Sequence, residues 1–246
     1  MRALGAATAA TVLLAVWATA GAVHPVDLRH PRPVSAVVHH IEHAGLETVL
    51  YEFGGDSVTT LEYLGQLRGE LSWVNWTDCP AVTHVGGFAV SGATTAGVLT
   101  GFAPVAGAEV LVIMAGTNDT RQGIPWSISS LYLGLIVQAS GLPADRVILS
   151  AIPPSDTVPG AALAYNAAAS ELAAASGWLY VDPWPAVRTE AGAWTPDASY
   201  DGAHPTGAVQ AVTGAILRDA IWSAVHPKSL VDVTPDAERV SSGSGS

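Results

Sequence analysis

Three residues of this 246-residue chain are of the types that together activate a hydroxyl nucleophile: Ser57, Asp201 and His204. A serine hydroxyl is a poor nucleophile until a neighbouring base, often an imidazole, takes its proton. Asp201 precedes His204 by three residues, so its carboxylate can accept a hydrogen bond from one ring nitrogen while the other nitrogen faces the serine. The competing interpretation is structural, because Asp, Ser and Gly are also ordinary turn and helix-capping residues.

The elements that would position Ser57 are a strand and a helix on either side of it. Residues 48–53 are rich in β-formers and short enough for a buried strand, which stops at two glycines. Leucines then recur at helical spacing, which predicts a helix over 59–71. Ser57 would therefore lie at the junction where open α/β sheets bind ligands and where backbone N–H groups stabilise anions.

Further strands and helices alternate along the chain, which favours a parallel sheet covered on both faces. Runs of β-formers predict strands at 48–53, 70–76, 110–114, 146–152 and 178–181. Apolar periodicity predicts helices at 59–71, 124–140, 161–176 and 206–222. The expected fold class is therefore α/β, a three-layer α/β/α sandwich around a mainly parallel five-stranded sheet.

Three stretches between these elements are candidates for the rim of a site. A glycine-rich stretch over 86–97 predicts an active-site loop that enters a helix near Thr94. The strand at 110–114 is followed by Gly116-Thr117-Asn118-Asp119. The long segment 182–200 lacks periodicity, and its Trp184 and Trp194 would stack on sugars if exposed or pack in the core if buried.

Four of these blocks, taken in order, resemble those of the SGNH (GDSL-type) hydrolase family over residues 48–222. They are Gly55-Asp56-Ser57, the stretch 86–97, Gly116-Thr117-Asn118-Asp119 and Asp201-Gly202-Ala203-His204. The resemblance implies a flavodoxin-like strand order, 2-1-3-4-5. It also implies a serine esterase that works through an acyl-enzyme and needs no metal or cofactor.

The resemblance further assigns roles to individual residues. Ser57, His204 and Asp201 would form the catalytic triad. The N–H groups of Ser57 and Gly92 and the side-chain amide of Asn118 would form the oxyanion hole, which stabilises charge on the former carbonyl oxygen.

The substrate stays open at this stage: it is a small-molecule, lipid or glycan ester, with acylated cell-envelope glycans among the candidates. An acyltransferase that acts on a glycan hydroxyl would use the same triad. A catalytically silent envelope protein that binds glycans is a third alternative, which the presence of all the expected reacting residues disfavours. The lipase-type G-x-S-x-G elbow does not occur in the sequence, and the oligomeric state is unknown.

Composition limits the partners and the number of domains. The formal net charge is −11 and the pI is about 4.9, which argues against nucleic acid as a partner because phosphate backbones would be repelled. Cys79 is the only cysteine, so no intramolecular disulfide can form. The length suits one sizeable domain, which we place at 45–227.

The two ends of the chain have the composition of processing and linker segments. Residues 1–22 combine a short basic start, a charge-free apolar run and small residues suited to cleavage, which predicts a signal peptide. A retained anchor with membrane association is the alternative, because about 20 apolar residues span a bilayer. We expect a secreted or cell-envelope protein, with an extended lead-in at 23–44 and a tail at 228–246 that is linker-like over 241–246.

A histidine-rich segment, His39-His40-Ile41-Glu42-His43, formally matches the zinc-protease pattern H-x-x-E-H. That pattern belongs on a central helix, whereas here Gly45 interrupts the segment and a strand follows. We interpret the segment as a solvated, histidine-rich surface and predict no metal site.

Overall fold

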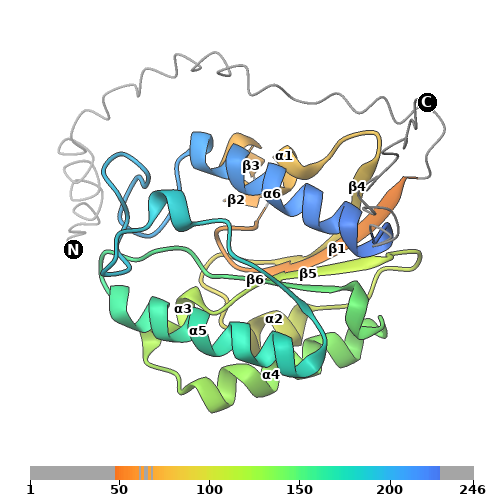
Figure 1. The fold of residues 1–246 in the computed structure, drawn as a ribbon, viewed down its shortest axis with the longest axis horizontal. Coiled ribbons are helices and arrows are strands. Elements are labelled where there is room, and N and C mark those ends of the chain that lie inside the picture. Colours follow the sequence, from red (N-terminus) through yellow and green to blue (C-terminus); the bar gives the residue numbers. More distant parts are fainter. Residues whose placement is uncertain (1–47, 61, 64–65, 68, 228–246) are drawn as a thin grey trace, which may run out of the picture. The chain divides into compact units, whose positions relative to one another are not determined.

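The computed structural model describes residues 48–60, 62–63, 66–67 and 69–227 (Figure 1). The predicted export segment 1–22, the lead-in 23–44, the motif His39–His43 and the tail 228–246 lie outside the described residues. All of the described residues fall within one compact unit.

Five parallel strands form the central sheet, in the order β4-β1-β5-β6-β7. The strands are β1 (Val49–Gly55), β4 (Val82–Ala89), β5 (Val110–Met114), β6 (Val147–Ser150) and β7 (Leu179–Val181). Counted along the chain, this order is 2-1-3-4-5, which confirms the predicted fold class and topology. Because all five strands run the same way, their carboxyl ends meet at one edge of the sheet.

Helices cover both faces of the sheet (Figure 1). One face carries α1 (Val74–Thr77) and α6 (Gly207–Val225). The other face carries α2 (Thr95–Gly101), α3 (Thr117–Gln122), α4 (Trp126–Ser140) and α5 (Pro159–Ser176). The described part of the chain also has three short 3-10 turns: η1 (Gly69–Leu71), η2 (Ala144–Arg146) and η3 (Pro185–Val187).

The central strand β5 contributes side chains to the hydrophobic cores on both faces of the sheet. Val110, Val112 and Met114 point into the core beneath α6, whereas Leu111 and Ile113 point into the core beneath α4 and α5. Alternate side chains of a strand point to opposite faces, so a strand covered on both faces must be apolar throughout. That is why the continuous run at 110–114 could be recognised from sequence.

The predicted helix at 59–71 is wrong. Within that range the structure has two short antiparallel strands, β2 (Glu62–Tyr63) and β3 (Gln66–Leu67), followed by η1. The leucine spacing was misleading because the segment also contains Gly65 and Gly69, and glycine weakens a helix. The backbone of Gly69 has a φ of +55°, outside the helical region.

The predicted strand at 70–76 is also wrong, because that range forms η1 and α1. Counted along the chain, the second strand of the central sheet is β4. Part of β4 was predicted to belong to the glycine-rich loop. Gly87 lies within it with a φ of +148°, and a Cβ there would collide with the backbone oxygen of Phe53 in β1. Glycine is therefore required for the close pairing of β1 with β4, and the loop proper begins only after Ala89.

The segment 182–206 places its tryptophans in the core. Trp184 is fully buried and Trp194 is 6% exposed, and their rings meet edge to face with centroids 5.8 Å apart. The Trp184 indole N–H donates to the carbonyl oxygen of Ala151. The sugar-stacking interpretation of these two residues is therefore wrong. Separately, no helix in the described part of the chain is long and apolar enough to cross a membrane.

Candidate active site

Ser57 lies just beyond the carboxyl end of β1, in a tight turn rather than at the start of a helix as predicted. The backbone N–H groups of Thr59 and Thr60 both donate to the carbonyl oxygen of Asp56. The Asp56 carboxylate also accepts a hydrogen bond from the N–H of Val58. This turn fixes the backbone on both sides of Ser57.

His204 and Asp201 lie on the segment that leads into α6, and the structure brings both to Ser57. His204 Nε2 lies 2.8 Å from Ser57 Oγ, and His204 Nδ1 lies 2.8 Å from Asp201 Oδ2. Because an ionised carboxylate can only accept hydrogen bonds, Nδ1 carries the proton and Nε2 accepts from the serine hydroxyl. His204 lies 147 positions after Ser57 in the sequence, so the fold brings distant parts of the chain together here.

The Asp201 carboxylate is anchored by its own turn. Its Oδ1 accepts the N–H groups of Ala203, at 3.0 Å, and His204, at 2.8 Å. Partial burial acts to raise the pKa of Asp201, but the hydrogen bonds from the ring and backbone of His204 and from Ala203 outweigh it, so the pKa is lowered. The carboxylate therefore stays ionised and holds the imidazole in one orientation.

Asn118 lies in the first turn of α3, directly after β5. Its Nδ2 donates to the carbonyl oxygen of Ala93 at 2.9 Å and lies 3.5 Å from Asp56 Oδ2. Two oxygen acceptors therefore fix which way the amide faces. The first contact also ties Asn118 to the loop that contains Gly92.

Gly92 lies on the exposed loop between β4 and α2, with a φ of +82°. A Cβ at this position would meet nothing within 4 Å. The need for glycine here is therefore conformational, since other residues rarely adopt this backbone geometry.

Two carboxylates that do not face solvent hold the loops around the site together. Asp119 accepts the hydroxyl of Ser129 at 2.7 Å, and the N–H and hydroxyl of Thr95 at 2.9 and 2.6 Å. It thereby connects the starts of α2 and α3 to α4.

Asp56, the residue before Ser57, is also fully buried. Burial raises its pKa from 3.8 to about 6, although the hydrogen bond from the Val58 N–H acts to lower it.

Comparison with known proteins identifies the family of the chain that carries this site. The profile of the GDSL-like lipase/acylhydrolase family matches residues 53–212. The chain is a member of that family. This membership makes it a carboxylic ester hydrolase by class and confirms the resemblance seen in the sequence.

Solved structures of this fold support the same architecture for the GDSL-like hydrolase. A lipase/acylhydrolase from Enterococcus faecalis is 20% identical, with a TM-score of 0.59 over 72% of this chain and 96% of that one. An aryl esterase from M. smegmatis is 16% identical, with a TM-score of 0.53 over 72% and 100%. A carbohydrate acetylesterase from Sinorhizobium meliloti is 14% identical, with a TM-score of 0.53 over 71% and 98%. No curated protein sequence matches the chain.

Some groups around the site of this GDSL-like hydrolase were not recognisable from sequence. Thr95 and Ser129, the partners of Asp119, have no distinguishing pattern, and the exposure of Tyr200 depends on the course of a loop. No three His, Cys, Asp or Glu side chains in the described ranges gather in a way that could hold a metal ion.

The buried Asp56 carboxyl predicts an unusual pH dependence of stability. The folded chain binds this proton near pH 6, whereas the unfolded chain binds it near pH 3.8, so the free energy of unfolding should rise as the pH falls from 7 to 5. We expect the contribution of this group to be on the order of 1 kcal/mol, and we expect Asp56→Asn to lack it. Urea unfolding at the two pH values measures both. The exposed Asp145→Asn is the control, and an unchanged pH dependence in Asp56→Asn would contradict the prediction.

Proposed function

We propose that this GDSL-like hydrolase is an exported serine esterase that cleaves carboxylic esters through an acyl-enzyme on Ser57. The observation that carries the proposal is the pair of 2.8 Å contacts that joins Asp201, His204 and Ser57. The contacts lie at the edge of the sheet where the strands end, the usual place for a site in such folds.

The first half of the reaction forms the acyl-enzyme. His204 Nε2 takes the Ser57 proton as Oγ attacks the ester carbonyl carbon, which gives a tetrahedral intermediate. The N–H groups of Ser57 and Gly92 and the Asn118 amide donate to the resulting oxyanion. His204 then gives its proton to the alkoxide as the carbon–oxygen bond breaks, and the alcohol leaves.

The second half returns the enzyme to its starting state. A water molecule loses a proton to His204 and attacks the acyl carbon. Ser57 Oγ then leaves and takes that proton back, which releases the carboxylic acid. Asp201 stays ionised throughout and stabilises the positive charge of the imidazolium.

We place the enzyme outside the cytoplasm and its substrate among the acylated glycans or lipids of the cell envelope. Residues 1–22 support export, and the acidic composition disfavours nucleic acid. The carbohydrate acetylesterase of similar fold is consistent with a glycan ester. Amino-terminal sequencing of protein recovered from a culture medium would test export, and recovery only in the cytoplasm would contradict it.

The assignment of the nucleophile is tested by labelling with a fluorophosphonate, followed by peptide mapping. We expect the label on Ser57, and we expect it to be absent in Ser57→Ala because the attacking oxygen is gone. The exposed Ser127→Ala on α4 is the control and should label normally. A correctly folded wild-type protein that takes no label would overturn the proposal and favour a silent glycan-binding protein.

A further inference from the structure

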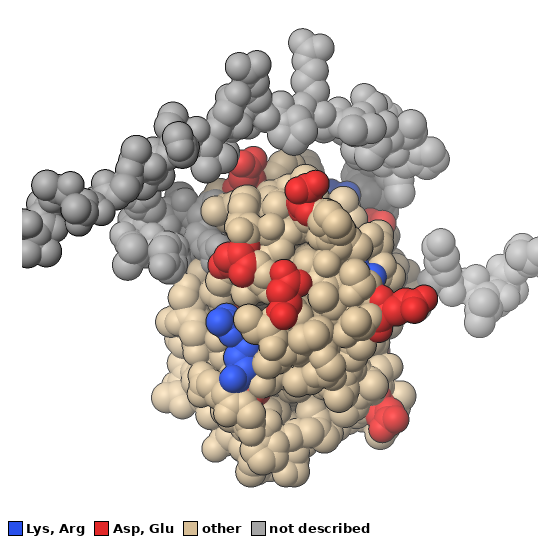
Figure 2. Space-filling view, turned by 90° about the vertical axis from the view of Figure 1, so that its left-hand side faces the viewer, with Lys and Arg blue, Asp and Glu red and all other residues tan. Residues whose placement is uncertain are grey.

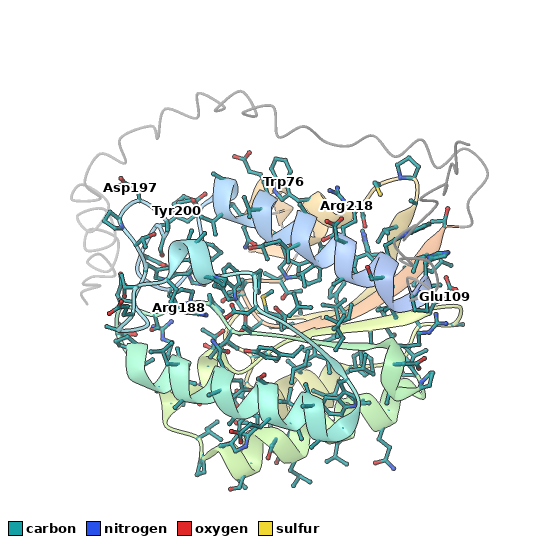
Figure 3. The ribbon with its side chains drawn as sticks, viewed as in Figure 1. Trp76, Glu109, Arg188, Asp197, Tyr200 and Arg218 are labelled. Atoms are coloured by element: carbon teal, nitrogen blue, oxygen red, sulfur yellow. The ribbon has the colours of Figure 1, made fainter. Side chains whose placement is uncertain are left out.

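Tyr200 leaves an aromatic ring in solvent on the loop that carries Asp201 and His204. It is 56% exposed, more than any other aromatic side chain in the described part of the chain. It directly precedes Asp201, on the loop that leads into α6 (Figure 3). Leaving a ring exposed forgoes the stabilisation that burial would give.

Hydrogen bonds hold Tyr200 at its ring hydroxyl and at its backbone. Its hydroxyl accepts the N–H of Gly207, at the start of α6, at 3.0 Å. Its backbone N–H donates to the carbonyl oxygen of His204 at 3.1 Å. A ligand that packs on this ring therefore meets a surface that is already ordered, so little conformational entropy is lost on binding.

The proposed reaction determines which part of the bound substrate lies on the same side as the Tyr200 ring. His204 must protonate the leaving alkoxide, so the alcohol portion of the ester lies on the His204 side of Ser57. His204 enters from the face of the sheet that α6 covers, whereas the loop with Gly92 and the turn with Asn118 lead into α2 and α3 on the other face. Tyr200, which is hydrogen-bonded to the His204 backbone, thus lies on the leaving-group side.

Two acidic side chains lie along the segment that follows Tyr200. The exposed carboxylates of Glu70 and Asp156 belong to side chains that lie against Gly207 and Gly202, at either end of this short segment. Figure 2 shows that most charged side chains in the upper half of this side of the molecule are acidic. Carboxylates accept hydrogen bonds from hydroxyl groups and repel anions. An apolar ring flanked by acceptors suits a neutral polyhydroxy ring.

We propose that Tyr200 is the specificity-determining platform for the alcohol portion of the substrate, and that this portion is an uncharged sugar ring. The proposal rests on the esterase function proposed above and names the substrate class of the same site. It assigns the glycan contact to an exposed tyrosine in place of the buried Trp184 and Trp194.

The test compares two esters that carry the same acyl group, one on methyl glucoside and one on ethanol. We expect Tyr200→Ala to lower the ratio of kcat/KM for the sugar ester to kcat/KM for the ethyl ester about fivefold to tenfold, the range of an aromatic stacking contribution. Tyr200→Phe keeps the ring and should retain most of that ratio. Leu131→Ala on α4, which removes a side chain of the same 56% exposure, should leave the ratio unchanged.

Each alternative outcome overturns the proposal in a different way. An equal loss on both esters would mean that Tyr200 only supports the His204 loop. An unchanged ratio would mean that the alcohol portion does not reach the ring. If the wild-type protein cleaved neither ester and Ser57 took no fluorophosphonate, the proposed esterase function would fail first, and the assignment of Tyr200 would fail with it.

Discussion

Replacing His204 by alanine is expected to lower kcat/KM for any ester substrate about 10⁴-fold or more, the typical loss when a triad base is removed. His204 Nε2 lies 2.8 Å from Ser57 Oγ, where the imidazole can take the hydroxyl proton. The loop should persist, because the His204 backbone makes hydrogen bonds that do not depend on the ring. The His204 carbonyl oxygen accepts from Tyr200 N–H and Ser199 Oγ, and neither bond needs the ring.

The matched control is His226→Ala, which removes a histidine from the far end of α6. His226 stacks on Trp222 with ring centroids 3.9 Å apart, and about 28 Å of helix separates it from the start of α6. Steady-state kinetics should show near-normal turnover for this variant. If His204→Ala kept more than a tenth of the wild-type rate with an unchanged thermal midpoint, another group would have to be the base.

The parts of the fold that could be predicted are the strands that are buried on both faces and the helices that have clear ends. The strands at 110–114 and 146–152 are buried on both faces, so their composition leaves few alternatives, and β5 and β6 lie within those ranges. The helices at 161–176 and 206–222 end near residues that cannot easily continue them, and α5 and α6 agree with these ranges to within a few residues.

The region from 59 to 89 could not be predicted because local pattern and tertiary context disagree there. The leucine spacing over 59–71 imitates a helix, and the apolar residues at 70–76 imitate a strand. Trp73, the N-cap residue of α1, and Val74, in α1, are fully buried, but they pack against the face covered by α6. In β4, the glycines that suggested a loop are present because β1 passes too close for a side chain at Gly87.

The part of the candidate site that lies at the ends of the strands could be predicted from the sequence. Ser57 and Asn118 follow neighbouring strands of a parallel sheet, so their proximity follows from topology. The contact between Asn118 and Ala93, and the exposure of Tyr200, depend on the course of loops and have no signal in composition. The roles assigned to Ser57, Gly92, Asn118, Asp201 and His204 remain predictions for the experiments described here.

Replacing Asn118 by alanine is expected to lower kcat about 10²–10³-fold with little change in KM, because its amide would donate mainly to the charge that develops in the transition state. One Nδ2 hydrogen is held by the Ala93 carbonyl oxygen at 2.9 Å. The other makes only the longer 3.5 Å contact with Asp56 Oδ2, so it is the one that would donate to the oxyanion. Asn118→Asp keeps the shape but replaces the donor by an anion, so it should lose more activity than Asn118→Ala. Asn75→Ala, at an exposed position on α1, is the control for steady-state kinetics. An aspartate variant more active than the alanine variant would show that Asn118 acts by packing rather than by donating a hydrogen bond.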